Sequence, residues 1–342
     1  MRLAPSLVPE VLAFYQSTST PELMHRANQV CRRTYGNEVF LRGLIEFTNF
    51  CVMDCHYCGI RQSNARAHRY RLTVEQIVGL ADAGWKYGLK TFVLQGGEDP
   101  WFTADRIVEI LEGIREATGG EGAVTLSVGI RSKAVYRRWK AAGADRYLMR
   151  FETSDPSLYA VMKNGARLED RLKALADLRE EGFEVGSGYM VGLPGETEET
   201  RIANALVCHE LDFDMVGIGP FIPHPDTPLG RAEQQPIDLA VRAAALVRLL
   251  LPEANMPATT AAGSLHKQGR EKMLAAGANV LMPNITPESV KKDYLLYPGK
   301  ICLDESGFEC IHCLDIRTHL VDKTLSWARG DSVNAAGRRV RP

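Results

Sequence analysis

The sequence lacks any long uninterrupted apolar run. None of its 342 residues falls in a stretch that reaches the roughly 20 consecutive apolar residues of a membrane-spanning helix. The first ten residues also lack the continuous apolar segment of a secretory signal peptide. These two absences predict a soluble, cytoplasmic protein.

The sequence also lacks a surplus of charge of either sign. It contains 41 Lys and Arg residues against 42 Asp and Glu residues, so its formal net charge is −1. Binding to nucleic acid or to an anionic membrane surface usually requires a basic surplus. We therefore expect neither of these partners. No low-complexity linker divides the chain, which favours a single domain spanning residues 1–342.

Short apolar runs alternate eight times with amphipathic stretches, which is typical of an α/β fold of the (β/α)8 TIM-barrel type. The predicted strands are residues 43–48, 91–95, 124–128, 146–151, 184–190, 215–219, 256–260 and 279–282. We expect an N-terminal helical segment at 1–40, the barrel at 41–290 and a C-terminal extension at 291–342. A doubly wound open sheet is the alternative, but it would need fewer strands or an extra domain.

Helix start signals support this division of the chain. Thr73, Ser132 and Thr197 each stand directly before a helical pattern and are predicted N-caps. In a barrel of this kind, functional residues lie in the loops that follow the C-terminal ends of the strands. Each strand end is therefore a place to look for chemistry.

Three cysteines, Cys51, Cys55 and Cys58, follow the first predicted strand with CX3CX2C spacing. Three thiolates can hold three irons of a four-iron four-sulfur cluster, and no fourth nearby cysteine is placed to bind the last iron. Structural zinc is the alternative, but His56 is badly placed to complete a tetrahedron with the neighbouring Cys55. In a reducing compartment, the eight cysteines of the chain favour ligand or packing roles over disulfides.

The three-cysteine pattern, with the aromatic Tyr57 before its last cysteine, resembles the radical S-adenosylmethionine (SAM) superfamily. The resemblance implies that the open iron binds SAM and that an electron from the cluster cleaves it to a deoxyadenosyl radical. Gly97 and Glu98, which follow the second strand, resemble the Gly-Gly-Glu motif of that superfamily. On their own, such glycines would indicate an ordinary turn at the strand exit.

Further cofactor contacts are predicted after the fourth and fifth strands. Glu152 is expected to pair with the ammonium of SAM and Arg171 with its carboxylate, unless the two simply pair with each other. The resemblance adds Tyr57 and Met190 to the cofactor-binding residues. The glycine-rich stretch 186–195 suggests that a group such as adenine packs against the fifth strand, although bulges would explain the same glycines.

Several longer strings are similar to the HydE family of FeFe-hydrogenase maturases, among them Arg-Gly-Leu-Ile-Glu-Phe, Met-Val-Gly-Leu-Pro-Gly, Pro-Ala-Thr-Thr-Ala and Leu-Tyr-Pro-Gly-Lys-Ile-Cys. This resemblance implies action on an organometallic iron precursor during assembly of the hydrogenase di-iron site, with an electron donor and maturation proteins as partners. The substrate-binding residues that it implies are Arg42, Thr125, Arg150, Thr259, Thr260, Met282, Asn284, Tyr294 and Tyr297. Strand threonines are otherwise most often β-formers.

A second cysteine group, Cys302, Cys310 and Cys313, follows the barrel with CX7CX2C spacing. The HydE resemblance implies an auxiliary iron-sulfur cluster here. A zinc site with His312, or three unliganded thiols, would fit the same residues. Cys31 and Cys208 stand in predicted helices and are expected to pack in the core.

Two positions depart from the HydE pattern. Phe151 stands where a histidine is expected, and Gly96 where a small hydroxyl residue is expected. Both changes favour, as an alternative, a HydE-like paralogue that acts on a different substrate. A methylornithine- or biotin-synthase-type enzyme that acts on an organic substrate is a separate alternative. An iron-sulfur carrier without enzymatic activity is the alternative of another class. His224 and Asp226, in the proline-rich loop after the sixth strand, are candidate acid and base or simply brace a turn.

Overall fold

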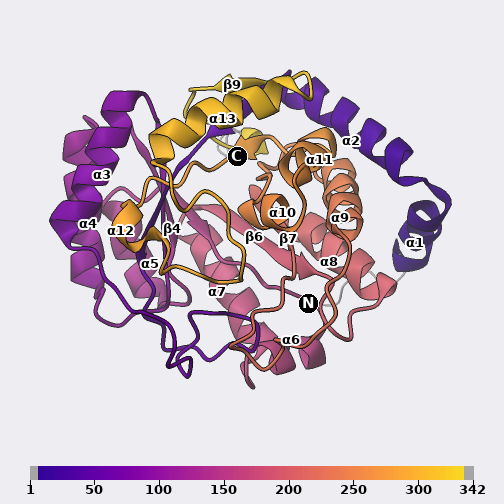
Figure 1. The fold of residues 1–342 in the computed structure, drawn as a ribbon, viewed down its shortest axis with the longest axis horizontal. Helices are drawn as coiled ribbons and strands as arrows, with labels where there is room; N and C mark the ends of the chain where they lie inside the picture. The colour runs from indigo at the N-terminus through magenta and orange to yellow at the C-terminus, as the bar shows by residue number, and fades with distance from the viewer. Residues whose placement is uncertain (1–6, 335–342) are drawn as a thin grey trace.

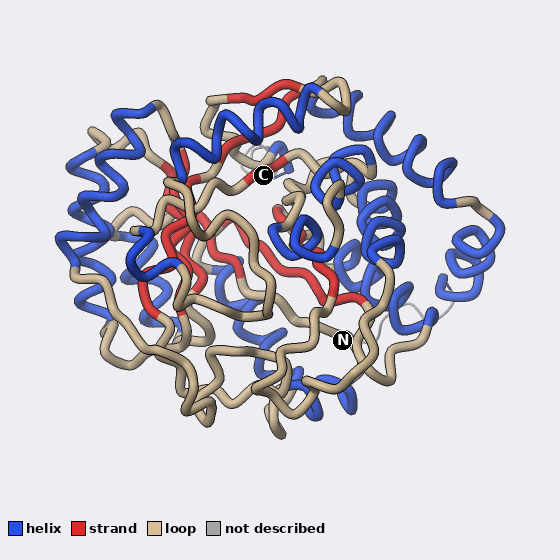
Figure 2. Tube along the Cα trace, viewed as in Figure 1, coloured by secondary structure: helices blue, strands red, loops and turns tan. Residues whose placement is uncertain are grey.

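The computed structural model describes residues 7–334 as strands surrounded by helices. The strands lie inside and the helices form an outer layer, with the C-terminal elements across one edge (Figures 1 and 2). Within the described range, no helix is both long and apolar enough to cross a membrane.

Twenty-two elements alternate along the described chain. The helices are α1 (Leu7–Ser17), α2 (Thr20–Tyr35), α3 (Val74–Tyr87), α4 (Ala104–Ala117), α5 (Lys133–Ala141), α6 (Pro156–Met162), α7 (Leu168–Glu180), α8 (Glu198–Glu210), α9 (Ile237–Leu250), α10 (Thr260–Leu265), α11 (Gly269–Ala275), α12 (Glu288–Lys291) and α13 (Gly307–His319). The strands are β1 (Glu38–Leu41), β2 (Gly43–Thr48), β3 (Thr91–Gly96), β4 (Ala123–Ser127), β5 (Arg146–Leu148), β6 (Glu184–Val191), β7 (Met215–Pro220), β8 (Val280–Leu281) and β9 (Thr324–Ser326).

The strands form two parallel sheets. Strands β2 to β7 pair in sequence order, and β1 lies between β8 and β9 in a second sheet. Single bridges continue the pairing from Met215 to Asn255, from Pro257 to Val280 and from Asn284 to Leu44. The predicted TIM-type α/β architecture is therefore confirmed, although the ladder among the described residues is not continuous around the ring.

The elements form where their residues favour them. All eight side chains of β6 are buried, as expected for a strand of a parallel sheet covered on both faces. In α4, Ile107, Ile110, Leu111 and Ile114 are buried, and their helical spacing turns one stripe toward the core. Thr73 makes a reciprocal capping box, whereas Ser132 occupies an N-cap position without a side-chain bond.

Some predicted boundaries are wrong. The expected helical segment ends earlier than residue 40, because residues 38–41 form β1. Residues 1–6 of that segment and residues 335–342 of the predicted extension lie outside the described range. In place of the predicted strand 256–260, the chain makes one single bridge at Asn255, just before it, and one at Pro257. Proline lacks the N–H that a continuous ladder needs. The predicted strands 146–151 and 279–282 are shorter, and the extension contributes β9 to the sheet.

The C-terminal extension closes the end of the strand assembly where the strands begin. The Gly330 carbonyl accepts hydrogen bonds from Arg42 Nη2 and Asn255 Nδ2, at 3.1 and 3.2 Å. Buried Arg146 pairs with Glu184 at 2.8 Å and donates to the Arg329 carbonyl at 3.2 Å. Access to the interior is therefore left to the opposite end, where the strands finish.

Candidate active site

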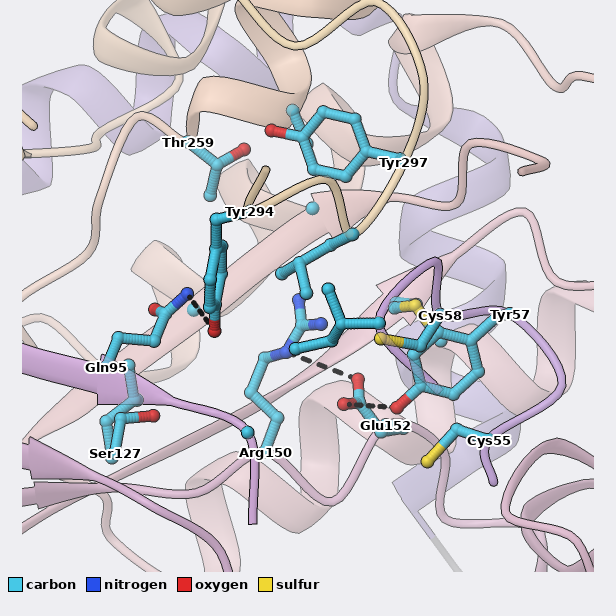
Figure 3. Close-up of a pocket in the computed structure, with 18 of the residues that line it drawn as sticks. Cys55, Tyr57, Cys58, Gln95, Ser127, Arg150, Glu152, Thr259, Tyr294 and Tyr297 are labelled. Carbon is cyan, nitrogen blue, oxygen red and sulfur yellow. Dashed lines mark hydrogen bonds and ion pairs between the residues drawn. The ribbon is translucent and has the colours of Figure 1, made fainter. Parts of the chain in front are cut away.

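A cavity of about 320 Å³ lies at the C-terminal ends of the strands (Figure 3). Its lining includes the three cysteines that follow β2 and residues from β3, β4, β7 and the segment after α12. This is the end of a TIM-type barrel at which loops from several strands can meet around one substrate. The predicted location of the chemistry is therefore the location of the cavity.

The cysteine loop, residues 49–59, is tied to two neighbouring loops. Its Val52 N–H donates to the Glu98 carbonyl at 3.0 Å, and its His56 N–H donates to the Met162 carbonyl at 2.9 Å. The Glu98 N–H in turn donates to Cys51 Sγ at 3.3 Å. All three cysteines face the cavity as free thiols.

Burial raises the pKa of the Cys51 and Cys58 thiols, that of Cys58 to about 12, and the neighbouring Cys55 adds to both shifts. Thiols in such surroundings stay protonated unless a metal cation displaces the protons. Three convergent cysteines of this kind, one buried and two partly buried, fit an iron-sulfur cluster.

Glycine at position 97 allows the loop after β3 to approach the cysteine loop. A β carbon on Gly97 would lie 2.1 Å from the Phe50 carbonyl oxygen and 2.8 Å from Cys51 Cβ. Gly129, at a φ of +78°, makes room for Glu98 in the same way, since a β carbon there would lie 2.0 Å from the Glu98 carboxyl carbon. The glycines thus serve close approach of neighbouring groups, not only a turn.

Glu152 turns its carboxylate into the cavity from a strained backbone. Its φ is +65°, an uncommon value for a residue with a side chain. Oε1 accepts a 3.0 Å hydrogen bond from the Tyr57 hydroxyl and lies 3.8 Å from Lys163 Nζ, while Oε2 lies 3.2 Å from Arg150 Nε. Burial raises the pKa of Glu152, but Arg150 and Lys163 lower it more, so the carboxylate is held in its charged form.

Arg171 supplies a second charged group at the cofactor side of the cavity. Its Nη2 lies 3.8 Å from Glu98 Oε1 and its Nε donates to the Tyr159 hydroxyl at 3.2 Å. Arg171 therefore pairs with Glu98 and not, as the alternative had it, with Glu152. Burial lowers the pKa of the Arg171 guanidinium, but Tyr159 and Glu98 raise it more.

The charges around the cysteines favour an anionic guest. Arg150, Lys163 and Arg171 line this side of the cavity against the two carboxylates of Glu98 and Glu152. These groups leave a surplus of one positive charge on a partly buried wall, which an anionic ligand group would balance. Cluster thiolates and the carboxylate of SAM both carry the required sign, so the residues present fit these groups.

The other side of the cavity carries neutral polar groups. Gln95 Nε2 donates to the Tyr294 hydroxyl at 3.4 Å, and Ser127 lies beside Gln95 in register on β4. Gly219 on β7 leaves room for Thr259 and Arg150, whose nearest atoms would lie 3.6 and 3.8 Å from a β carbon there. Figure 3 shows Thr259, Tyr294 and Tyr297 on the side opposite Cys55.

Comparison with known proteins identifies this arrangement. The model of the radical SAM superfamily matches residues 45–206. The chain is 45% identical over 308 residues to the FeFe-hydrogenase maturase subunit HydE of Thermotoga maritima, which covers 90% of this chain and 88% of that one. The chain belongs to the radical SAM superfamily and to its HydE family. It is therefore a radical SAM enzyme.

Less similar matches include a methylornithine synthase and a second hydrogenase maturase. The chain is 28% identical over 284 residues to 3-methylornithine synthase of Methanosarcina acetivorans, covering 82% of this chain and 79% of that one. The crystal structure of methylornithine synthase (PylB) superposes with a TM-score of 0.80 at 24% identity, over 100% of this chain and 97% of that chain. That of the maturase HydG gives 0.78 at 18%, over 95% and 80%. At these identities the structures show the shared fold.

Most residues that the HydE resemblance implies do line the cavity, but three do not. Arg42 lies at the opposite end of the barrel, where its Nη1 also contacts Met215 Sδ at 3.0 Å. Thr125 is buried at the start of the β4–β5 pairing. Asn284 donates to Glu46 Oε2 at 2.7 Å from behind the lining. The expectation that these three residues line the cavity is wrong.

The structure also adds lining residues that the sequence had not suggested, namely Glu46, Ser127, Lys163 and Lys300. Glu46 could have been predicted from the sequence, because a charged residue inside a largely apolar strand needs a charged partner or a ligand. Lys163 follows α6 and Lys300 lies in an irregular segment, so neither belongs to a periodic pattern.

The second cysteine group is only partly assembled. Cys302, Glu305 and Cys310 present ligand atoms within 4.8 Å of one another. The Cys310 thiol donates to Cys302 Sγ at 3.8 Å, and Arg270 Nη1 lies 3.7 Å from the same sulfur. Cys313 instead bonds Arg317 one turn along α13. Cys313 therefore lies apart from the other two thiols, and the three-cysteine ligand set stays a prediction.

The remaining candidates, His224, Asp226, Phe151 and Gly96, differ in where the structure places them. His224 Nδ1 accepts from the Asp226 N–H at 3.1 Å, so this pair braces a turn. Phe151 is fully buried against Tyr189 and Phe213 and does not line the cavity. Gly96 does line the cavity, where a β carbon would lie 2.8 Å from Thr48 Cγ2.

The glycines of β6 have a packing role. A β carbon on Gly188 would lie 2.1 Å from the Gly217 carbonyl oxygen of β7. The two backbones are therefore close enough to exclude a side chain at this position. The cavity itself is lined by Gly217 and Gly219 of β7, together with Met190 of β6.

Proposed function

We propose that this enzyme reductively cleaves SAM and directs the resulting deoxyadenosyl radical at a small organometallic iron precursor in assembly of the FeFe-hydrogenase active site. The observation that carries the proposal is the 45% identity to the Thermotoga maritima HydE over 90% of the chain. The cavity supports it as well, because its lining combines three cysteines with a surplus of cationic groups.

The residues divide the work between two sides of the cavity. Cys51, Cys55 and Cys58 would hold the cluster, and Glu152 and Arg171 would hold the ammonium and carboxylate of SAM. When bound, the cluster and SAM supply a one-electron cleavage of the sulfonium that yields methionine and a deoxyadenosyl radical.

Other cavity residues position and shield these groups. The backbone around Gly97 and the hydroxyl of Tyr57 approach the cofactor side, and Met190 offers an apolar surface to adenine. The walls confine the reacting groups at short distance and exclude water, so orientation takes the place of acid-base chemistry.

On the substrate side, Arg150, Thr259 and Tyr297 offer donors around an otherwise apolar space. Donors of this kind suit a cyanide or carboxylate group on a compact ligand. The glycine at position 96 favours an organic substrate instead, because the family resemblance leads us to expect a residue with a small hydroxyl group there. Ser127 on the adjacent strand still places a hydroxyl in the lining.

The substrate class is tested by giving the anaerobically reconstituted enzyme SAM, dithionite and one substrate at a time. A synthetic iron complex bearing carbon monoxide, cyanide and cysteinate should be consumed together with SAM, and its infrared carbonyl bands should change. Free lysine, as the methylornithine-type probe, should leave the rate of deoxyadenosine formation unchanged. Deuterium transfer from labelled lysine to deoxyadenosine, with the iron complex untouched, would overturn the organometallic assignment.

A further inference from the structure

A short segment of the C-terminal extension, residues 294–300, crosses the substrate side of the cavity and is named the strap here. Tyr294, Tyr297 and Lys300 of the strap all line the cavity. Its ends are fixed outside that span, since the Asp293 carbonyl accepts from Asn49 Nδ2 at 2.7 Å and the Ile301 N–H donates to Ser264 Oγ at 3.2 Å. The strap therefore carries much of the substrate contact between two anchored ends.

One ammonium group joins the strap to the barrel. Lys300 Nζ lies 2.6 Å from Oε1 and 2.7 Å from Oε2 of Glu46, a residue in the middle of β2. The same nitrogen donates to the Tyr294 carbonyl at 3.0 Å. Lys300 thus ties the two ends of the strap to each other and to a fixed strand.

This ion pair is shielded from water. The side chains of Lys300 and Glu46 are 7% and 3% exposed. Asn284 Nδ2 occupies a further position on the carboxylate at 2.7 Å. Removing one partner of a buried pair leaves an uncompensated charge, whereas removing both often costs little. Loss of either Lys300 or Glu46 should therefore break the whole connection between the strap and β2.

The strap also reaches the cysteine loop. The Gly59 N–H donates to the Leu296 carbonyl at 2.9 Å, and a β carbon on Gly59 would lie 2.1 Å from the Leu295 carbonyl oxygen. A shift of the strap would consequently change the substrate side of the cavity and press on the backbone next to Cys58. The position of the strap has to be fixed for both sides to keep their spacing.

We propose that Lys300 is a positioning residue for substrate. Its ion pair with Glu46 holds the strap at a fixed distance from β2. This fixes where the Tyr294 and Tyr297 side chains contact the substrate. The contact of Tyr294 with Gln95, which would be lost if the strap rose, reports the same geometry. This inference deepens the proposed function, because it takes the cavity to be the place where the substrate binds.

The pair is tested with Lys300→Met, Glu46→Gln and the double variant, read by hydrogen-deuterium exchange of peptides covering residues 294–300 in the full-length reconstituted enzyme. Each single variant should exchange roughly tenfold or more faster there than wild type, because the connection that holds the strap closed is lost. The double variant should exchange no faster than either single variant, because both break the same connection.

Lys323→Met is the matched control. Lys323 is also a buried lysine of the extension, but its Nζ contacts Cys31 Sγ at 3.5 Å, far along the chain from the strap. The Lys323→Met variant should therefore leave the rate of hydrogen-deuterium exchange of the strap unchanged. Lys300→Arg, which keeps a cation that can bond Glu46 with two nitrogens, should restore slow exchange at least in part.

Binding of SAM separates positioning from general damage. In the Lys300 variants the KM for the substrate complex should rise by a larger factor than the Kd for SAM, because the strap contacts the substrate side directly and the cysteine loop only through Gly59. Unchanged exchange of the strap in both single variants would overturn the inference. Because exchange needs no turnover, an enzyme that failed to cleave SAM would contradict the proposed function without affecting this result.

Discussion

The Tyr57 hydroxyl donates a 3.0 Å hydrogen bond to Oε1 of Glu152, which joins the cysteine loop to the loop after β5. The carboxylate that would bind the ammonium of SAM is therefore oriented by a residue lying between two of the cluster cysteines. Any change in the cysteine loop is transmitted directly to the cofactor carboxylate. Cluster binding and SAM binding should accordingly depend on each other.

Lys163 is expected to tune the cluster. Burial lowers the pKa of its ammonium, but the Cys55 thiolate and Glu152 raise it more, so the charge is retained. Lys163→Met should lower the midpoint potential of the cluster, because adding an electron becomes harder without the nearby positive charge. A potentiometric titration followed by electron paramagnetic resonance measures this shift. Lys173→Met, which removes a 73% exposed lysine, is the control, and equal potentials in both variants would argue against the role.

Gly97→Ala should prevent normal assembly of the cofactor site. Its new methyl group would meet the Phe50 carbonyl oxygen, and backbone cannot withdraw as a flexible side chain can. Iron and sulfide content after reconstitution should fall. Gly79→Ala, in α3 where nothing lies within 4 Å, should keep full iron and gain about 0.5–1 kcal/mol of stability. Full iron loading of Gly97→Ala would be incompatible with the tight approach described.

Asp99 makes a pH-dependent contribution to stability. Burial raises the pKa of its carboxyl group, but hydrogen bonds from Arg71 and Thr48 lower it more, so it falls below the ordinary 3.8. The stabilisation is thus complete above about pH 3.8 and is lost as the pH falls through the lower folded value.

Asp99→Asn should cost about 2 kcal/mol at neutral pH, since a charge-assisted bond to Arg71 is lost. Urea unfolding at pH 7, 5 and 3 should give the same penalty at the first two values and a smaller one at pH 3, which lies below the ordinary pKa of 3.8. A loss of unfolding free energy in Asp99→Asn that became larger as the pH fell would show that the carboxylate is not stabilised in its charged form.

The second cysteine group should bind metal through Cys302 and Cys310 and not require Cys313. Cys302→Ala and Cys310→Ala should each lose any iron held beyond the first cluster, while Cys313→Ala should retain it, because Cys313 pairs with Arg317. Metal analysis of the reconstituted variants decides this. Cys310→Ala should also keep much of the SAM cleavage, since the site lies outside the cavity lining. Equal loss in Cys313→Ala would restore the three-cysteine set.

Local patterns were enough to predict most of the fold. Apolar runs such as Thr91–Gly96 and the capping box at Thr73 determine their own secondary structure. The interruption at residues 255–257 was not predicted, because single bridges there depend on neighbours far along the chain. Strand β9 pairs with β1 across almost 290 residues, and nothing in its three residues indicates that partner.

The candidate site divides in the same way. Spacing alone predicted the cysteine loop, because its ligands lie within eight residues of one another. Lys163 and Lys300 reach the cavity from irregular backbone, so only the folded chain shows their place. Arg42 was misplaced because the HydE resemblance assigned it to the cavity, although it directly precedes β2 and so lies at the end where the strands begin. In the structure it contacts the Gly330 carbonyl at that end.

The central claim is radical SAM chemistry at the three cysteines, and deoxyadenosine formation tests it most directly. Wild-type enzyme and Cys55→Ala, each reconstituted anaerobically and given SAM and dithionite, are compared by chromatography of the nucleoside product. The wild type should form deoxyadenosine and Cys55→Ala should form none above background. Equal formation by Cys55→Ala, or none by wild-type enzyme with a spectroscopically intact cluster and the iron substrate present, would contradict the claim.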